Sequence, residues 1–167
     1  MMTVQIIVDI LKAVMQLDED RVWVWNQREE IPKDKGLFIA VGMMGIVPFG
    51  SNSKPVSTVN GMQEQLSQQM QETITVNVYS YDTSAILRYP EVIGAMASTY
   101  SQNQQEKYQF RIAQVPSSVN DASFAEGGGI LYRFDMTFRI LRSYGTINDI
   151  AYYDTHSTTV IQDEVAQ

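Results

Sequence analysis

Apolar and polar side chains alternate along residues 129–144, which predicts a long β-strand with one buried face. The even-numbered positions from 130 to 140 are apolar or aromatic, and they include Phe134 and Phe138, which we expect in the core. The odd-numbered positions from 133 to 139 are charged or polar. Residues 72–82 repeat the alternation, so the two runs together predict an antiparallel sheet.

Two further stretches show helical rather than alternating periodicity. Apolar residues recur every three or four positions over residues 3–17, which predicts a helix capped by Thr3 and ended by the acidic residues 18–20. A second helix is expected from Asp82 or Thr83 to about residue 100, with a kink or restart at Pro90. Residues 101–107 are polar, and we expect them to form a connection.

Shorter strands are predicted over residues 21–26, 37–47 and 110–115. In the first, either Val22 and Val24 face the core while Trp23 and Trp25 cover another surface, or the tryptophans are core and the valines half-exposed. The second, simpler interpretation is preferred. The apolar run 37–47 contains two glycines, so it is expected to be covered on both faces or bent by a bulge. Its neighbouring residues Met43 and Met44 are expected to fill the core.

Turn-forming residues dominate two connections. Residues 48–61 have no periodicity and residues 62–71 are rich in glutamine, so 48–71 is expected to be a protruding loop or a hairpin arm. Residues 117–129 end in Gly127, Gly128 and Gly129. These glycines run into a strand and are followed by no lysine, so we expect a flexible entry to that strand rather than a phosphate cradle.

These elements predict an α+β fold, an antiparallel or mixed β-sheet with two helices packed on one face. One domain is expected over residues 1–150, with the arm at 48–71 and an extended C-terminal tail at 151–167. Residues 48–71 and 147–167 are long and polar, and they are expected to lack partners within the chain.

Composition narrows the class of protein. The 167 residues are 44% hydrophobic and 19% charged, as in ordinary globular domains. The net charge of -7 argues against a basic nucleic-acid-binding molecule, and the absence of cysteine excludes disulfides and thiolate sites. Charges interrupt the apolar N-terminal run and no apolar run is long enough to cross a bilayer, so we expect a soluble, cytoplasm-made protein without a signal peptide.

Residues able to support chemistry are few. His156 is the only histidine, it lies beside Asp154, and a single histidine cannot build a recognisable zinc site. The pair Glu29 and Glu30 and the acids Asp149 and Asp154 are expected to be solvated side chains. We therefore assign no catalytic, cofactor-binding or metal residues and do not expect an enzyme.

A family resemblance points to a function. The run ITVNVYSYDTSAI, the amphipathic helix after it, a short strand, a glycine-rich loop with Asp121, and YRFDMTFRILRSYG together resemble the neck or tail terminator proteins of tailed bacteriophages. The resemblance is one of pattern and element order over about residues 3–150. Residues 48–71 and the last fifteen or so have no counterpart in it.

The resemblance implies a structural virion protein that forms a ring, expected to be hexameric, at the head-proximal end of the tail. Such a ring stops tail-tube growth and joins the tail to the neck. Its expected neighbours are tube, neck or connector, and sheath proteins, with assembly in the host cytoplasm. Genomic DNA would pass through the lumen without specific binding, and acids such as Asp18, Glu19, Asp20, Glu29 and Glu30 are candidates to line it.

Three alternatives remain open at the level of sequence. The first is another tail component, a tube or baseplate subunit. The second is a small non-catalytic binding module that uses the loop at 48–61. The third is a small enzyme on a ferredoxin-like sheet, which would need a pocket with convergent polar groups.

Overall fold

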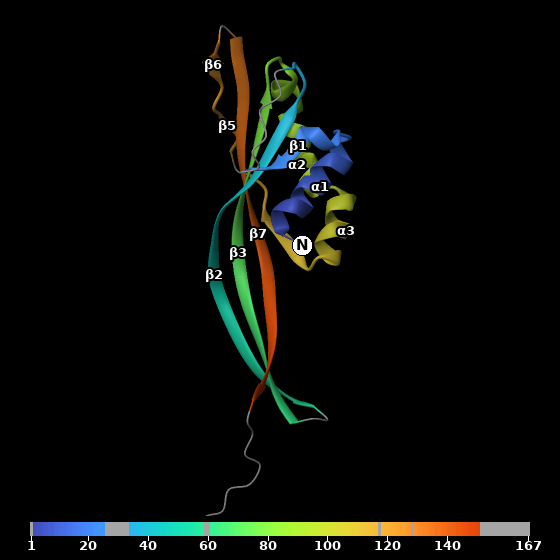
Figure 1. Ribbon diagram of the computed structural model, residues 1–167, viewed down its shortest axis with the longest axis vertical. Coiled ribbons are helices and arrows are strands. Elements are labelled where there is room, and N and C mark those ends of the chain that lie inside the picture. Colours follow the sequence, from blue (N-terminus) through green and yellow to red (C-terminus); the bar gives the residue numbers. More distant parts are fainter. Residues whose placement is uncertain (1, 26–33, 59–60, 117, 128, 151–167) are drawn as a thin grey trace, which may run out of the picture.

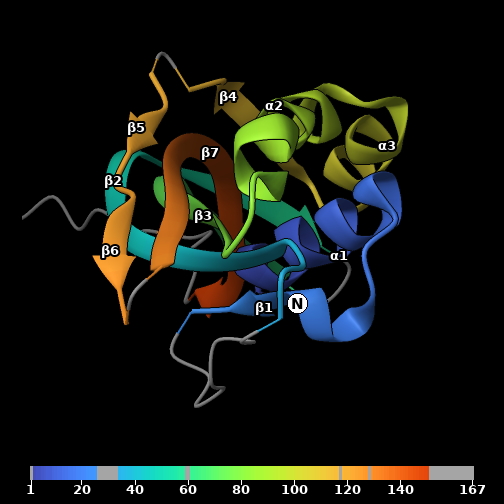
Figure 2. The same ribbon diagram turned by 90° about the horizontal axis from the view of Figure 1, so that it is seen from above.

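The computed structural model describes residues 2–25, 34–58, 61–116, 118–127 and 129–150. These residues form a mixed seven-stranded sheet with three helices, which confirms the expected α+β class (Figure 1). The helices lie together against one face of the sheet, and Figure 2 shows the same layering from above.

The sheet is built on two long antiparallel pairs. Its strand order is β1-β2-β3-β7-β4, with β1 parallel to β2 and the other neighbours antiparallel. Two short strands, β5 and β6, pair with β7 off this path. The strands are β1 (Val22–Val24), β2 (Phe38–Thr58), β3 (Gly61–Ser80), β4 (Phe110–Gln114), β5 (Asn120–Asp121), β6 (Phe124–Glu126) and β7 (Gly129–Ile150).

The first helix, α1 (Thr3–Met15), ends slightly earlier than expected because Gln16 adopts a left-handed conformation. Its N-cap is Met2, which makes no side-chain cap bond, so the expected capping role of Thr3 is wrong. Thr3 is instead a buried helical residue whose hydroxyl accepts a hydrogen bond from Arg142 Nη1 at 3.0 Å. A tertiary contact therefore uses the oxygen that the sequence offered as a cap.

The second expected helix is divided in two. Helix α2 (Ser84–Ala97) contains Pro90 in its interior, and the interruption falls later, at Ser98. Ser98 is extended, and its hydroxyl accepts a hydrogen bond from Ser101 N at 3.1 Å, which starts α3 (Thr99–Lys107). The expected connection at 101–107 is thus a helix.

The main core lies between the helices and the inner face of the sheet. Phe134 and Phe138 are buried there, as the alternation predicted. Ile130, by contrast, is 51% exposed although it shares their parity. At this end of β7 the buried neighbour is Leu131, which faces the second apolar cluster.

That second cluster lies on the other face of the sheet and comprises Trp23, Phe38, Ala40, Tyr79 and Leu131. Val22 belongs to the main core and Trp23 to the second, so β1 is buried on both faces. The preferred assignment of core tryptophans with half-exposed valines is therefore wrong for Val22 and for Trp25, which is 46% exposed.

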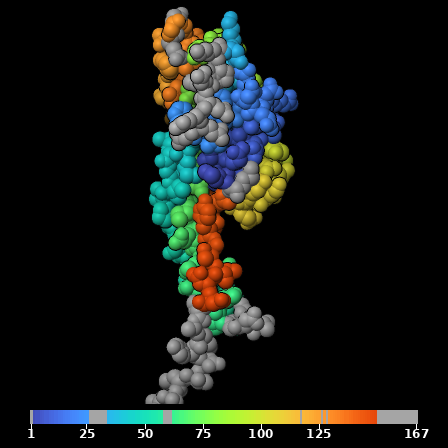
Figure 3. All heavy atoms as spheres, viewed as in Figure 1, coloured from blue at the N-terminus to red at the C-terminus, as the bar shows by residue number. Residues whose placement is uncertain are grey.

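Strands β2, β3 and β7 continue well past the helices as a three-stranded arm (residues 45–58, 62–72 and 140–150; Figure 3). Residues 48–58 are therefore strand rather than loop, and the hairpin form of the arm is the one observed. The expectation that these segments lack partners is wrong for the described residues. Residues 48–58 of β2 pair with 61–70 of β3, and residues 62–65 of β3 pair with 147–150 of β7. Residues 151–167 lie outside the described part of the chain.

The expected burial of Met43 and Met44 also fails. Met43 and Met44 are 38% and 69% exposed, because the bulge between Met43 and Gly45 shifts the register where the helices stop covering the sheet. Gly127 has a φ of +55° in the turn that follows β6, and Gly129 begins β7 and pairs with Glu126, so these two glycines belong to a hairpin. Gly128 lies outside the described residues.

Candidate interaction surface

The arm extends beyond the helices and contributes little to the hydrophobic core. Apart from Ile140 at its base, no described apolar side chain of the arm is fully buried. Exposed ones occur on both faces: Ile46, Val47, Phe49, Tyr144 and Ile147. Three strands normally need a hydrophobic face or a packed layer to be stable in water. An arm without either is a surface suited to contact with another molecule.

Polar side chains tie the three strands to one another along the arm. Gln63 Nε2 donates to Asp149 Oδ1 at 2.9 Å, and the Ser67 and Ser143 hydroxyls lie 2.8 Å apart. Ser53 also donates to Glu64. These cross-strand contacts set the alignment of the arm in place of apolar packing.

A buried carboxylate marks the base of the arm. Glu72 is fully buried, and its Oε1 accepts a hydrogen bond from the Tyr144 hydroxyl at 2.6 Å. No described residue donates to its second oxygen, Oε2. The hydrogen bond to Glu72, with partial burial, raises the pKa of Tyr144. The Arg142 guanidinium lies 5.2 Å from the Tyr144 ring centroid and also bonds Thr3, so this cluster connects the arm to α1.

A row of stacked rings crosses the other face of the sheet. The ring centroids of Trp23 and Phe38 are 5.5 Å apart and those of Phe38 and Tyr79 are 5.1 Å apart, both nearly parallel. The Arg133 guanidinium continues the row at 5.4 Å from the Tyr79 ring. The row spans β1, β2, β3 and β7, and burial raises the pKa of Tyr79.

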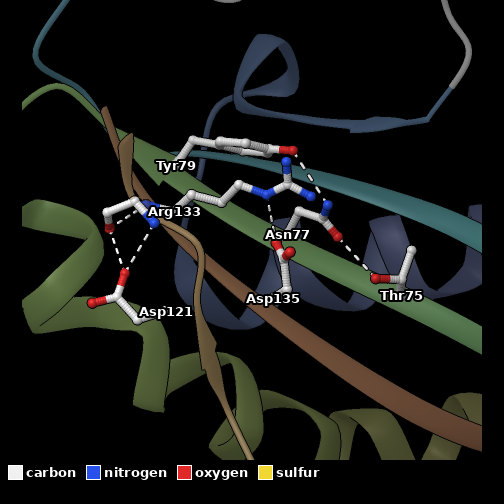
Figure 4. Close-up of polar contacts among 7 residues, drawn as sticks. Thr75, Asn77, Tyr79, Asp121, Arg133 and Asp135 are labelled. Atoms are coloured by element: carbon white, nitrogen blue, oxygen red, sulfur yellow. Dashed lines mark hydrogen bonds and ion pairs between the residues drawn. The ribbon is translucent and has the colours of Figure 1, made fainter. Parts of the chain in front are cut away.

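A polar network surrounds the end of that row (Figure 4). Thr75 donates to Asn77 at 2.9 Å, and Asn77 donates to the Tyr79 hydroxyl at 3.2 Å. Arg133 Nε donates to Asp135 at 2.7 Å. The Arg133 backbone N–H donates to the Ser123 hydroxyl, which in turn donates to Asp121 at 2.6 Å. The Ser123 contacts lower the pKa of Asp121.

Four residues of the network line a hollow of about 600 Å³ on this face: Thr75, Asn77, Arg133 and Asp135. Trp25, Met43 and Met44 supply its apolar wall, and its charged wall holds Arg133, Arg139 and Asp135. Two arginines against one aspartate make the hollow locally positive on a chain of net charge -7. Within the hollow Thr75 donates to Asn77 and Arg133 donates to Asp135, so these four side chains are held in place by one another in pairs.

The acids named as candidate lumen residues are only partly described. Glu19 and Asp20 lie in a short 3-10 helix (Glu19–Arg21). Arg21 forms two hydrogen bonds with Asp34, at 2.8 and 2.6 Å. Those bonds, with one from the Gly36 N–H, lower the pKa of Asp34 to about 2. Glu29, Glu30, Asp154 and His156 lie outside the described residues, and Asp149 is the arm residue that accepts from Gln63.

The sequence reasoning missed Glu72 and Tyr144 as a pair. Glu72 stands at a core-facing position of the alternation that continues through Ile74 and Val76, and an acid in such a position was an available signal. Its partner is 72 residues away, so only the strand register could identify it.

Within the described ranges, no group of three or more histidines and carboxylates is placed to hold a metal ion. None of the described helices has the length and apolar character needed to cross a membrane. No protein-family model matches the chain, and no curated protein matches its sequence.

Proposed function

We propose that this protein is a structural component of a phage virion, a neck or tail terminator that assembles into a ring. The observation that carries the proposal is the three-stranded arm, whose faces are exposed and which has no core of its own. A single chain gains little from building such an element. An assembly gains a long contact surface whose side chains can be buried by neighbouring copies.

The role follows from the resemblance together with this surface. A ring of such chains, with a hexamer as the expected size, sits at the head-proximal end of the tail. It stops growth of the tail tube and takes part in head–tail joining through tube and neck proteins. The work is done by surface complementarity, and no catalytic step is assigned to it.

The locally positive hollow supports a contact role over an enzymatic one. Asn77 is already bonded to Thr75 and Tyr79, and Arg133 is bonded to Asp135. The strand ladder beneath them fixes their positions. Groups held in this way favour recognition of a complementary protein surface. They offer no activated nucleophile to a substrate.

Native mass measurement with negative-stain imaging of the purified chain tests the proposal. The expected result is a closed ring with an open centre and one mass. Open-ended tubes would favour the tube-subunit alternative, and a compact monomer at all concentrations would overturn the ring.

A further inference from the structure

The two long edges of the arm differ in their ability to accept another strand. One edge is β2 beyond Val41, where its pairing with β1 ends. The other is β7 beyond Arg142, where its pairing with β4 ends. Each is hydrogen-bonded to its inner neighbour through the register with β3. Exposed edges of this length are templates for pairing unless the sequence blocks them.

The β2 edge is blocked. Pro48 and Pro55 lie opposite Met70 and Glu64 of β3, and the even separation of these partners puts both prolines at equivalent places in the ladder. A proline is tolerated in an edge strand where its nitrogen points outward, so each removes an N–H from the open side. The bulge between Pro48 and Gly50 and the charge of Lys54 interrupt the same edge.

The β7 edge is less protected, because its single charged side chain, that of Asp149, lies near its far end. Residues 143–150 read SYGTINDI, with no proline, no lysine and no register shift against β3. No described strand pairs with them on the side away from β3. Their side chains are exposed through position 149, including Ile147 at 64%. This edge is therefore open to one further strand.

We infer that the β7 edge binds the β7 edge of a second copy in antiparallel orientation. A sheet that continues from one arm into another needs an unblocked edge from each. Because the β2 edge is blocked, β7 is the edge that each copy can provide. Two identical edges that pair in this way are related by a two-fold axis. This axis is perpendicular to the sheet, so opposed side chains stay on the same face. The axis must therefore lie midway between one residue and the same residue of the second copy.

Two registers satisfy this symmetry near the middle of the edge. With the axis at Thr146, the threonines face each other, Gly145 faces Ile147 and Tyr144 faces Asn148. With the axis at Ile147, the isoleucines face each other and Thr146 faces Asn148. Asp149 is the only charged residue of 143–150, and in neither register does it face itself. Neither pairing brings like charges together, and both form cross-strand contacts that stabilise a sheet.

This contact goes beyond the proposed ring and is separate from the contacts that close it. A ring whose two ends differ repeats one head-to-tail contact, whereas the β7 pair is two-fold. It therefore joins two chains, or two rings, arm to arm.

Single cysteines test the pairing directly, because the chain contains none. Opposed residues of an antiparallel pair have Cα atoms about 4.5–5.5 Å apart, within the range that a disulfide spans. Under mild oxidation, Thr146→Cys or Ile147→Cys is expected to give a disulfide-linked dimer. Ser53→Cys, on the blocked edge, is the matched control and is expected to stay monomeric on a non-reducing gel. Failure of both β7 variants, or equal dimer from Ser53→Cys, overturns the inference.

A charge variant provides the second measurement. Ile147→Lys puts a lysine on the open edge without altering the backbone, and Asn52→Lys does the same on the blocked edge. Ile147→Lys is expected to reduce the native mass to that of the unpaired form, whereas Asn52→Lys keeps the wild-type mass. Rings that persist but no longer pair support both proposals. If wild type forms dimers but no rings, the β7 contact is supported and the ring is not. A native mass that Ile147→Lys leaves unchanged overturns the β7 contact.

Discussion

Glu72 shows how one side chain can connect the core to the arm. It occupies a position where the alternation calls for an apolar residue, and it is as deeply buried as its neighbour Ile74. Its Oε1 is satisfied by a tyrosine that is itself 43% exposed. The hydroxyl of Tyr144 thus gives a buried carboxylate its described hydrogen bond, at the place where the helices stop covering the sheet.

Tyr144→Phe is expected to destabilise the fold by about 1–3 kcal/mol, because it leaves a buried acceptor of Glu72 without its donor. The free energy of unfolding from denaturant titration measures the effect. Tyr100→Phe, in α3 and also partly exposed, is the control and is expected to be nearly neutral. Equal stability of the Tyr144→Phe variant and wild type would show that the contact contributes nothing.

Phe138 tests the assignment of the buried face. Phe138→Ala removes a side chain that is 1% exposed and is expected to cost about 3–5 kcal/mol, since a cavity remains beneath the helices. Thr137→Ala, next to it on the exposed side of β7, should change stability by less than about 0.5 kcal/mol. A thermal melt in which Thr137→Ala is the more damaging change would contradict the observed face.

The ion pair of Asp34 is expected to make the stability of the fold depend on pH. The hydrogen bonds from Arg21, then that from Gly36, lower its pKa from 3.8 to about 2, so the folded state favours the ionised carboxylate. The stabilising contribution is therefore present above pH 3.8 and is lost as the pH falls towards 2. A carboxyl-detected NMR titration should give the low value in wild type and a higher one in Arg21→Ala. If Arg21→Ala leaves the pKa of Asp34 unchanged, the hydrogen bonds from Arg21 are not its cause. Arg88→Ala, which does not contact Asp34, is the control.

At the scale of elements, the arm is a sheet whose stability comes from its register and not from a core. Leu66 lies opposite Thr146 and Gln65 lies opposite Ile147, so apolar residues are scattered over both faces. Strands with two polar faces specify their pairing weakly. The arm is accordingly the element whose order should depend most on its surroundings.

Hydrogen exchange should separate the arm from the body of the sheet. In the isolated chain, amides of residues 62–68 and 144–149 are expected to exchange faster than those of 74–78 and 134–140, because local opening exposes little apolar surface. Assembly should slow exchange in the arm and protect it from limited proteolysis. The expectation for residues 151–167, outside the described part, is the same. Equal protection of arm and body in the isolated chain would show that the arm needs no partner.

At the scale of the whole molecule, the acidic net charge bears on passage of DNA. A cation-lined channel binds duplex DNA by releasing counterions, whereas an acidic one repels the phosphates within a Debye length of about 8 Å at physiological salt. Asp18, Glu19 and Asp20 are all exposed, which suits such a lining. Glu29 and Glu30 remain candidates on sequence grounds alone.

The proposed ring is therefore expected not to retain duplex DNA even at low salt. A pull-down across a salt series measures this, with a basic DNA-binding protein as the positive control. Retention that weakens as salt increases would contradict an acidic lumen and favour a connector that grips DNA. The arginines of the hollow would then be the first residues to change, beginning with Arg139→Ala.

The sequence by itself determined the α+β class, the buried face of β7 at Phe134 and Phe138, and the existence of the first two helical segments. These follow from periodicity, which depends on residues two to four positions apart. Ser98 could also have predicted the start of a new helix, because serine is a strong N-cap. The polar composition of 101–107 instead indicated a connection.

Only the tertiary structure decided the arm, the second apolar cluster and the Glu72–Tyr144 contact. Residues 48–58 look like a loop because their local preferences are those of turns, yet pairing with β3, and of β3 with β7, makes them a strand. Trp23, Phe38 and Tyr79 stack because β1, β2 and β3 lie side by side, with Phe38 opposite Tyr79 and Trp23 opposite Ala40. Each of these features depends on cross-strand neighbours, and a local pattern contains no information about which residue stands opposite.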